Sequence, residues 1–73
     1  MERIKVKSSN LSSVGYDPET ETMEIEFTNG RIYRYEKVPE WIYRDLIDPK
    51  LPISKGHYFA TAIKKNYQFK EVT

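Results

Sequence analysis

The fold is decided by residues 22–35, which read Thr22-Met23-Glu24-Ile25-Glu26-Phe27-Thr28-Asn29-Gly30-Arg31-Ile32-Tyr33-Arg34-Tyr35. Apolar and acidic side chains alternate strictly in the first half, so Met23, Ile25 and Phe27 share one face of the chain. A period of two is typical of a strand that is buried on one side only. Asn29-Gly30 is a common hairpin turn, and residues 31–37 are predicted to form the returning strand.

The length of the hairpin loop decides which face the two tyrosines of the returning strand occupy. A two-residue Asn-Gly loop would place Tyr33 and Tyr35 on the glutamate face. A three-residue loop, residues 28–30, requires Gly30 in the left-handed region and places Tyr33 opposite Ile25. We favour the three-residue loop because it buries one continuous apolar face.

The rest of the chain supplies further strands and two helices. Residues 11–17 are predicted to form another strand, and residues 68–72 a short strand at the sheet edge. Pro39 fits the start of a helix, and Ser54 is a good N-cap for a second helix that runs to about Lys65. The first helix is expected to bury Trp41, Ile42, Leu46 and Ile47, and the second Phe59, Ala62 and Ile63. The sequence therefore predicts an α+β fold, a small antiparallel sheet of three to five strands packed against two short helices.

Length and composition limit the architecture to one domain, residues 1–73. Aromatic residues make up 14% of the chain, which is typical of a folded domain and not of a disordered one. The N-terminal residues 1–7 contain no apolar stretch of the length that a signal sequence needs. No window approaches the roughly 20 apolar residues of a membrane span. We therefore expect a cytoplasmic protein that does not interact with membranes, and the sequence does not predict its oligomeric state.

Catalytic and metal-binding patterns are not found in the sequence. Cysteine is absent and His57 is the only histidine, which excludes thiolate sites and paired imidazole ligands. The three glycines are isolated, so no glycine-rich phosphate loop exists. Glu24 and Glu26 face the same way on their strand and are predicted to form a solvated face. We expect no catalytic residue, no metal and no cofactor.

Charge is distributed unevenly along the chain. Residues 1–30 carry three basic and six acidic groups, whereas residues 31–73 carry nine basic and five acidic groups. Aromatic side chains are interleaved with the lysines of the second half. Cations that follow phosphates and rings that stack on bases are the two components of single-strand recognition. We therefore predict a non-catalytic module that binds RNA or single-stranded nucleic acid, through Arg31, Arg34, Lys55, His57, Tyr58, Lys64, Lys65, Tyr67 and Lys70.

Two other functions are open from the sequence. The predicted edge strand, residues 68–72, could pair with a strand of a partner protein. Ser54-Lys55-Gly56 at a helix start offers free N–H groups and a cation, which could hold a small anionic ligand such as a nucleotide. Tyr33 and Tyr35 could either stack on bases or be core residues, and the favoured register makes them core residues.

The order and spacing of these motifs resemble one known family. Residues 8–17 and 29–30, Tyr33-Arg34-Tyr35, Val38-Pro39 and residues 54–59 resemble the KTSC domain, over residues 6–72. That family is named for the C-terminus of some lysyl-tRNA synthetases, and its hallmark is a Tyr-x-Tyr motif, matched here by Tyr33 and Tyr35. Its function is unknown, and RNA binding has been suggested for it.

The chain departs from the family pattern around the second helix. Family members often carry Asn after the residue that corresponds to Phe59, followed by a stretch rich in arginine. Here Ala60, Lys64 and Lys65 occupy these places. Lysine makes point-charge contacts, whereas arginine can bind bidentately, so the resemblance implies a weakened version of any role of those residues.

Overall fold

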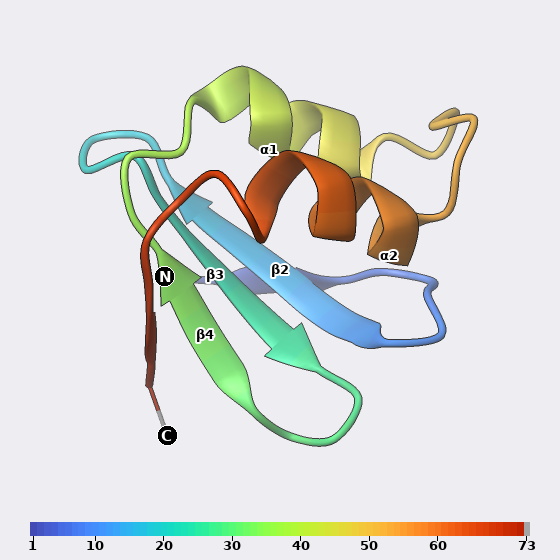
Figure 1. The fold of residues 1–73 in the computed structure, drawn as a ribbon, viewed down its shortest axis with the longest axis horizontal. Coiled ribbons are helices and arrows are strands. Elements are labelled where there is room, and N and C mark those ends of the chain that lie inside the picture. The colour runs from blue at the N-terminus through green and yellow to red at the C-terminus, as the bar shows by residue number, and fades with distance from the viewer. Residues whose placement is uncertain (73) are drawn as a thin grey trace.

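The computed structural model describes residues 1–72, which form a five-stranded antiparallel sheet with two helices on one face. In chain order the strands are β1 (Arg3–Lys5), β2 (Leu11–Asp17), β3 (Thr22–Phe27), β4 (Ile32–Tyr35) and β5 (Phe69–Glu71). The helices are α1 (Glu40–Ile47) and α2 (Lys55–Tyr58), and a π-helical turn, η1 (Phe59–Ile63), continues α2. Figure 1 shows both helices lying over the sheet. The predicted α+β fold is confirmed.

The order of the strands in the sheet follows the order in the chain, β1-β2-β3-β4-β5. The central hairpin has the register that buries one apolar face, with Met23 opposite Tyr35 and Ile25 opposite Tyr33. Gly30 adopts a φ of +89°, and the N–H of Phe27 donates to the carbonyl of Arg31 across the loop at 2.8 Å. The prediction of a three-residue loop is therefore confirmed.

The core lies between the sheet and the helices. Strands β2, β3 and β4, helix α1 and the turn η1 contribute buried side chains to it, because strand alternation and the helical period turn apolar residues to the same layer. The buried apolar residues are Leu11, Val14, Met23, Ile25, Tyr35, Val38, Ile42, Leu46, Phe59 and Ile63.

Trp41 is the one residue of the predicted helical core that was placed wrongly, since its side chain is 61% exposed. Pro39 is the residue before helix α1, and Ile42 and Leu46 form the buried stripe one turn apart. Trp41 precedes Ile42 by one position, and a single step rotates a side chain by about 100° around the helix. It is therefore turned away from the sheet.

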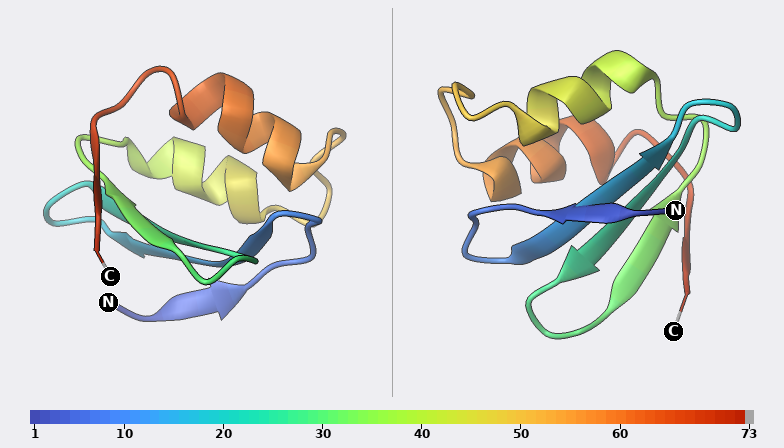
Figure 2. Two further views of the ribbon diagram at one scale, coloured as in Figure 1. Left: turned by 60° about the horizontal axis from the view of Figure 1, so that its bottom comes forward. Right: turned by 180° about the vertical axis from the view of Figure 1, so that it is seen from behind.

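The open face of the sheet also differs from the sequence prediction. Glu24 is only 5% exposed, although it was expected on a solvated face. Its carboxylate accepts hydrogen bonds from Arg3 and, at 2.9 Å, from Arg34. The two views of Figure 2 show that β1 lies on the side of the sheet away from the helices, and β1 brings Arg3 over this face. Aliphatic stems of arginine can cover a neighbouring group while their charged ends stay in water.

No helix of residues 1–72 combines the length and the apolar character that crossing a membrane requires.

Candidate functional site

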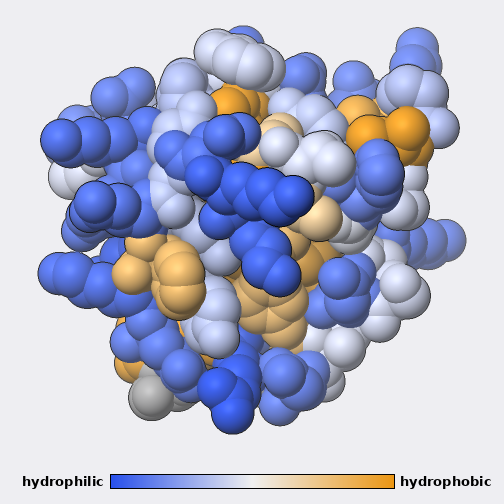
Figure 3. Space-filling model, viewed as in Figure 1, coloured by the Kyte–Doolittle hydropathy of each residue, from blue (hydrophilic) through white to orange (hydrophobic). Residues whose placement is uncertain are grey.

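An open groove of about 420 Å³ lies where the second helix, the tip of the β3–β4 hairpin and β5 meet. We call it the aromatic groove, because five of the side chains that line it are phenylalanine or tyrosine. Its lining residues are Asn10, Phe27, Thr28, Asn29, Arg31, Tyr33, Tyr35, Phe59, Lys64 and Phe69. Figure 3 shows apolar surface below the second helix, bordered by hydrophilic side chains.

The five rings form one connected cluster. Phe69 of β5 stacks on Tyr33 of β4, with the ring centroids 4.9 Å apart and 15° between the ring planes. Tyr35 contacts both Phe69 and Phe59, the latter edge to face at 5.6 Å. Phe27 completes the cluster by edge-to-face contacts with Tyr33 and Phe59. Phe69 is 51% exposed, so the cluster presents one ring to solvent while the others are held by their neighbours.

Two cations border this ring cluster. Arg31 follows the hairpin loop, and its guanidinium lies 3.5 Å from the carboxylate of Glu71, a pair in which both side chains are largely exposed. Lys64 follows the π-helical turn and has no salt-bridge partner within residues 1–72. Its N–H donates to the carbonyl of Phe59 at 2.9 Å, which is the wide i→i−5 bond of that turn. One cation therefore comes from the hairpin and the other from the end of the second helix, and both line the same groove as the rings.

The hydroxyl group of Tyr35, the second tyrosine of the Tyr-x-Tyr motif, stays neutral in this setting. Burial raises the pKa of Tyr35 to about 12, and the neighbouring Tyr33 contributes to the same shift. At neutral pH the Tyr35 phenol is therefore protonated and can donate a hydrogen bond. Tyr35 is a core residue and Tyr33 is half-buried, and both also form part of the groove wall.

The structure distributes the predicted site residues over several places instead of one surface. Only Arg31 and Lys64, together with Tyr33 and Tyr35, meet at the aromatic groove. Arg34 and Lys70 are register partners that lie on the opposite, open face of the sheet. The exposed residues His57 and Lys65 lie on the second helix and at its end, and Tyr67 packs against the core.

Lys55 and Tyr58 join the two helices to each other. The Lys55 ammonium donates to the carbonyls of Leu46 and Asp48 at 2.7 and 3.1 Å, at the C-terminal end of α1. The Tyr58 hydroxyl donates to the Asp45 carboxylate at 3.2 Å. Burial and this carboxylate raise the pKa of Tyr58 to about 12. We therefore leave Lys55 and Tyr58 out of the ligand contacts proposed below.

Each residue of the helix start Ser54-Lys55-Gly56, which the sequence offered as a site for a small anion, makes contacts within the protein that account for it. The Ser54 hydroxyl accepts from the N–H of His57 at 3.1 Å, as an N-cap does. Lys55 is bound to carbonyls of α1. Gly56 packs against the side chain of Asn10, where a larger residue would collide with the amide. These contacts do not favour a nucleotide at this helix start.

Sequence reasoning missed Phe27, Phe59 and Phe69 as groove residues. Phe59 was assigned to the core, and the structure places it both in the core and in the groove wall. Phe69 lies beside Tyr35 because β5 pairs with β4, a contact between segments more than 30 residues apart. The alternation of Phe69 and Lys70 was a signal for a ring on the apolar face, but its position in the sheet depended on that pairing.

No group of three or more His, Cys, Asp or Glu side chains within residues 1–72 is arranged to hold a metal ion.

Comparison with known proteins identifies a family. The model of the KTSC domain matches residues 7–67. An uncharacterized protein of Stutzerimonas stutzeri is 39% identical over 67 residues, which cover 92% of this chain and 90% of that protein. A lysine–tRNA ligase of Nostoc sp. is 33% identical over 70 residues, which cover 96% of this chain but 12% of the ligase. The crystal structure of a KTSC domain protein from Yersinia pestis is 33% identical, covers 99% of this chain and 97% of that chain, and superposes with a TM-score of 0.87. The chain therefore belongs to the KTSC domain family.

Proposed function

We propose that the protein is a non-catalytic module that binds single-stranded RNA in the aromatic groove. The observation that carries the proposal is the exposed ring of Phe69, which stacks on Tyr33 in a groove that the cations Arg31 and Lys64 also line. A base that stacks on an exposed aromatic side chain gains about 1–3 kcal/mol, whatever its identity. The backing ring of Tyr33 holds Phe69 in place, so little side-chain freedom is lost when a base stacks on it.

Phosphate contacts in this proposal come from the two groove cations. The Arg31–Glu71 pair is exposed, and pairs of this kind contribute little to stability, so Arg31 can exchange its carboxylate for a phosphate at small cost. Lys64 has no acidic partner within residues 1–72 to give up. The exposed lysine at position 65 and the exposed His57 extend the basic surface along the helix.

The occurrence of a similar sequence within a lysine–tRNA ligase supports an RNA ligand. A similar sequence forms 12% of a lysine–tRNA ligase, an enzyme whose substrate is tRNA. A small domain attached to such an enzyme would act close to RNA. The cytoplasmic location expected from the sequence is part of the same proposal.

An amide chemical-shift titration with a mixed-sequence single-stranded RNA, at low and at near-physiological salt, tests the proposal. We expect the largest shifts at the hairpin tip, at residues 64–65 and in β5, and we expect them to weaken with salt. Phe69→Ala should weaken binding by about 1–3 kcal/mol through the loss of stacking. The double variant Arg31→Glu/Lys64→Glu should lower the salt slope by about 1.4, or 0.7 for each lost phosphate contact.

Lys70→Glu is the matched control, because it reverses one exposed cation on the opposite face of the sheet. We expect its RNA affinity to stay close to that of the wild type at near-physiological salt. Shifts that map to the open face, or no shifts even at low salt, would contradict the proposal.

A further inference from the structure

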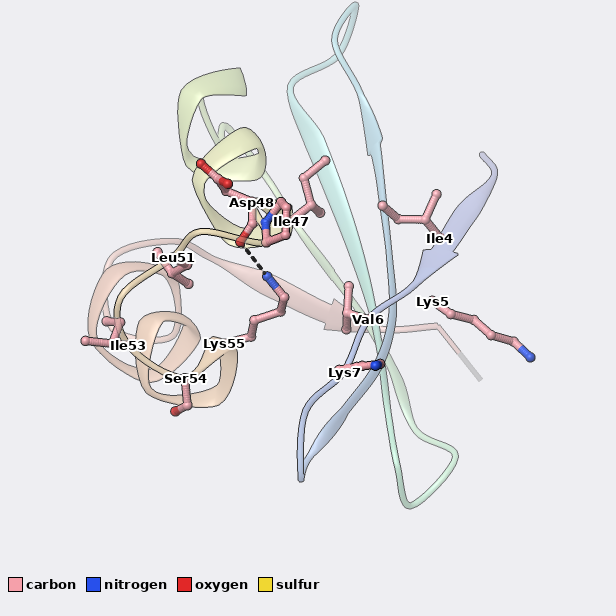
Figure 4. A pocket seen from close by; sticks show the side chains of 11 residues that line it. Ile4, Lys5, Val6, Lys7, Ile47, Asp48, Leu51, Ile53, Ser54 and Lys55 are labelled. Atoms are coloured by element: carbon pink, nitrogen blue, oxygen red, sulfur yellow. Dashed lines mark hydrogen bonds between the residues drawn. The ribbon is translucent and has the colours of Figure 1, made fainter.

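A second groove, separate from the aromatic groove, lies along the free edge of β1. It has a volume of about 380 Å³ and separates residues 4–7 from residues 47–55, the end of α1 and the loop that leads to α2. Figure 4 shows Ile4 and Val6 on one side of the groove, and Ile47, Leu51 and Lys55 on the other side. Ile4 is 45% exposed and Ile53 is 42% exposed, so apolar surface is open to water on both sides. We call it the edge groove.

The backbone of β1 is available for pairing on the groove side. β1 is at the end of the strand order, and within residues 1–72 it pairs with β2 alone. The N–H of Val6 donates to the carbonyl of Ser12 in the β2 segment at 3.1 Å. In an antiparallel pair, alternate residues turn their N–H and C=O groups to opposite sides. The backbone groups of Lys5 and Lys7 therefore face outward, as an added strand requires.

The side chains along this edge alternate in chemistry. Ile4 lies opposite Val14 and therefore on the helix side of the sheet, whereas Lys5 lies opposite Ser13 on the open side. Lys7 shares the side of Lys5 by alternation. Both lysines are exposed and neither has a salt-bridge partner within residues 1–72. The one carboxylate on the groove wall, Asp48, already accepts from the N–H of Lys50 at 2.8 Å.

We propose that the edge groove binds an extended peptide segment of a partner protein, as a sixth strand beside β1, in which apolar and acidic residues alternate. The apolar side chains would lie on the helix side against Ile4, Val6 and Leu51. The acidic side chains would lie on the other side, next to Lys5 and Lys7, where opposite charges on neighbouring strands are favourable.

The charge of β1 favours an acidic partner strand over the β1 strand of a second copy of the chain. Two β1 strands that paired edge to edge would bring lysines against lysines, and like charges directly across a ladder are destabilising. Lysines on an edge strand are a known protection against such pairing. The same two lysines that oppose a second β1 attract an acidic strand.

Synthetic peptides of about six residues, the usual length of a strand, test this proposal. One peptide alternates valine and glutamate, and the other alternates valine and lysine. We expect only the acidic peptide to shift the amide signals of residues 4–7 and 47–53 and to slow hydrogen exchange at Lys5 and Lys7. Placing a proline at the centre of the acidic peptide should abolish binding, because proline cannot donate to the ladder.

A charge swap makes the test specific. In the Lys5→Glu/Lys7→Glu variant, the affinity for the acidic peptide should fall about tenfold, because the contributions of two surface ion pairs are lost together. The basic peptide should now bind. Binding of the basic peptide also shows that the variant is folded. Lys64→Glu/Lys65→Glu makes the same change of charge outside this groove and should bind the acidic peptide as the wild type does. Equal binding of both peptides to the wild type, or no binding of either, would overturn the proposal.

Discussion

The two faces of the sheet are built from the same strands but are held together by different forces. On the helix side, Met23, Ile25 and Tyr35 are at most 1% exposed and are packed under α1 and the second helix. On the open side, Glu24 is buried without any helix above it, because Arg3 and Arg34 lie over its carboxylate. Neighbouring residues of β3 thus have different surroundings, since Met23 and Ile25 lie in the apolar core and Glu24 lies in an ion cluster on the other face.

The difference shows what each kind of contact can accomplish in a domain of 73 residues. Apolar packing has no direction and stabilises in proportion to the buried area, so the helix side supplies most of the stability. The ion cluster depends on direction, and it ties β1 to β3 and β4 through a single carboxylate. The main role of the ion cluster on the open face is therefore to hold β1 in its position, and its contribution to the stability of the whole domain is smaller.

The largest effect is expected when an isoleucine of the helix side is truncated. Ile25→Ala should lower the free energy of unfolding by about 2–5 kcal/mol, because it leaves a cavity in a fully buried position. Ile32 is the matched control, since it lies half-buried on the open face beside Glu26. Ile32→Ala should cost roughly half as much or less, because less apolar area is buried there. Chemical denaturation measures both, and equal losses would contradict the contrast between the faces.

The next effect concerns the carboxylate of the open face. Glu24→Gln should lower the free energy of unfolding by about 1–3 kcal/mol, because a buried partner of two arginines loses its charge. Glu26→Gln is the control, because its amide oxygen can still accept from the Ser13 hydroxyl, which donates to Glu26 at 2.8 Å. We also expect faster amide hydrogen exchange in β1 of the Glu24 variant. A loss no greater than that of the control would mean that the ion cluster has no stabilising role.

The same carboxylate predicts a dependence on pH. Burial acts to raise the pKa of Glu24, but the hydrogen bonds and charges of Arg34 and Arg3 outweigh it and hold the pKa below its ordinary value of 4.5. A folded-state pKa below the unfolded value means that the contribution is present above about pH 4.5 and is lost as the pH falls through the folded pKa. The stability difference between the wild type and Glu24→Gln should therefore shrink in acid. Urea denaturation between neutral pH and about pH 3 measures it, and a constant difference would contradict the assignment.

The sequence was sufficient for the local parts of this architecture. Strict alternation in residues 22–27 and the need for a left-handed glycine at position 30 fixed the register of the central hairpin. Both are properties of neighbouring residues, so no knowledge of the tertiary fold was needed. Ser54 was also predicted correctly as an N-cap, for the same reason.

What the sequence did not reveal depends on contacts between distant segments. Trp41 is exposed because the stripe of α1 is centred on Ile42 and Leu46, which only the docked helix shows. Glu24 is buried because β1 brings Arg3 across the sheet from 21 residues away. The aromatic groove arises when β5 joins β4 and sets Phe69 on Tyr33. The charge pattern showed that residues 31–73 are the more basic part of the chain, but it could not say which cations share a face.

The smallest effect is expected for the outermost charge of the open face. Lys70 and Glu36 are separated by 3.9 Å, and their side chains are 77% and 46% exposed. Lys70→Ala should therefore change the free energy of unfolding by less than about 0.5 kcal/mol, as is usual for exposed pairs. Thermal and chemical denaturation at low and high salt would measure it. A loss as large as that of Glu24→Gln would mean that the ion cluster extends across the whole open face into β5, whereas a negligible loss confines it to the strands that surround Glu24.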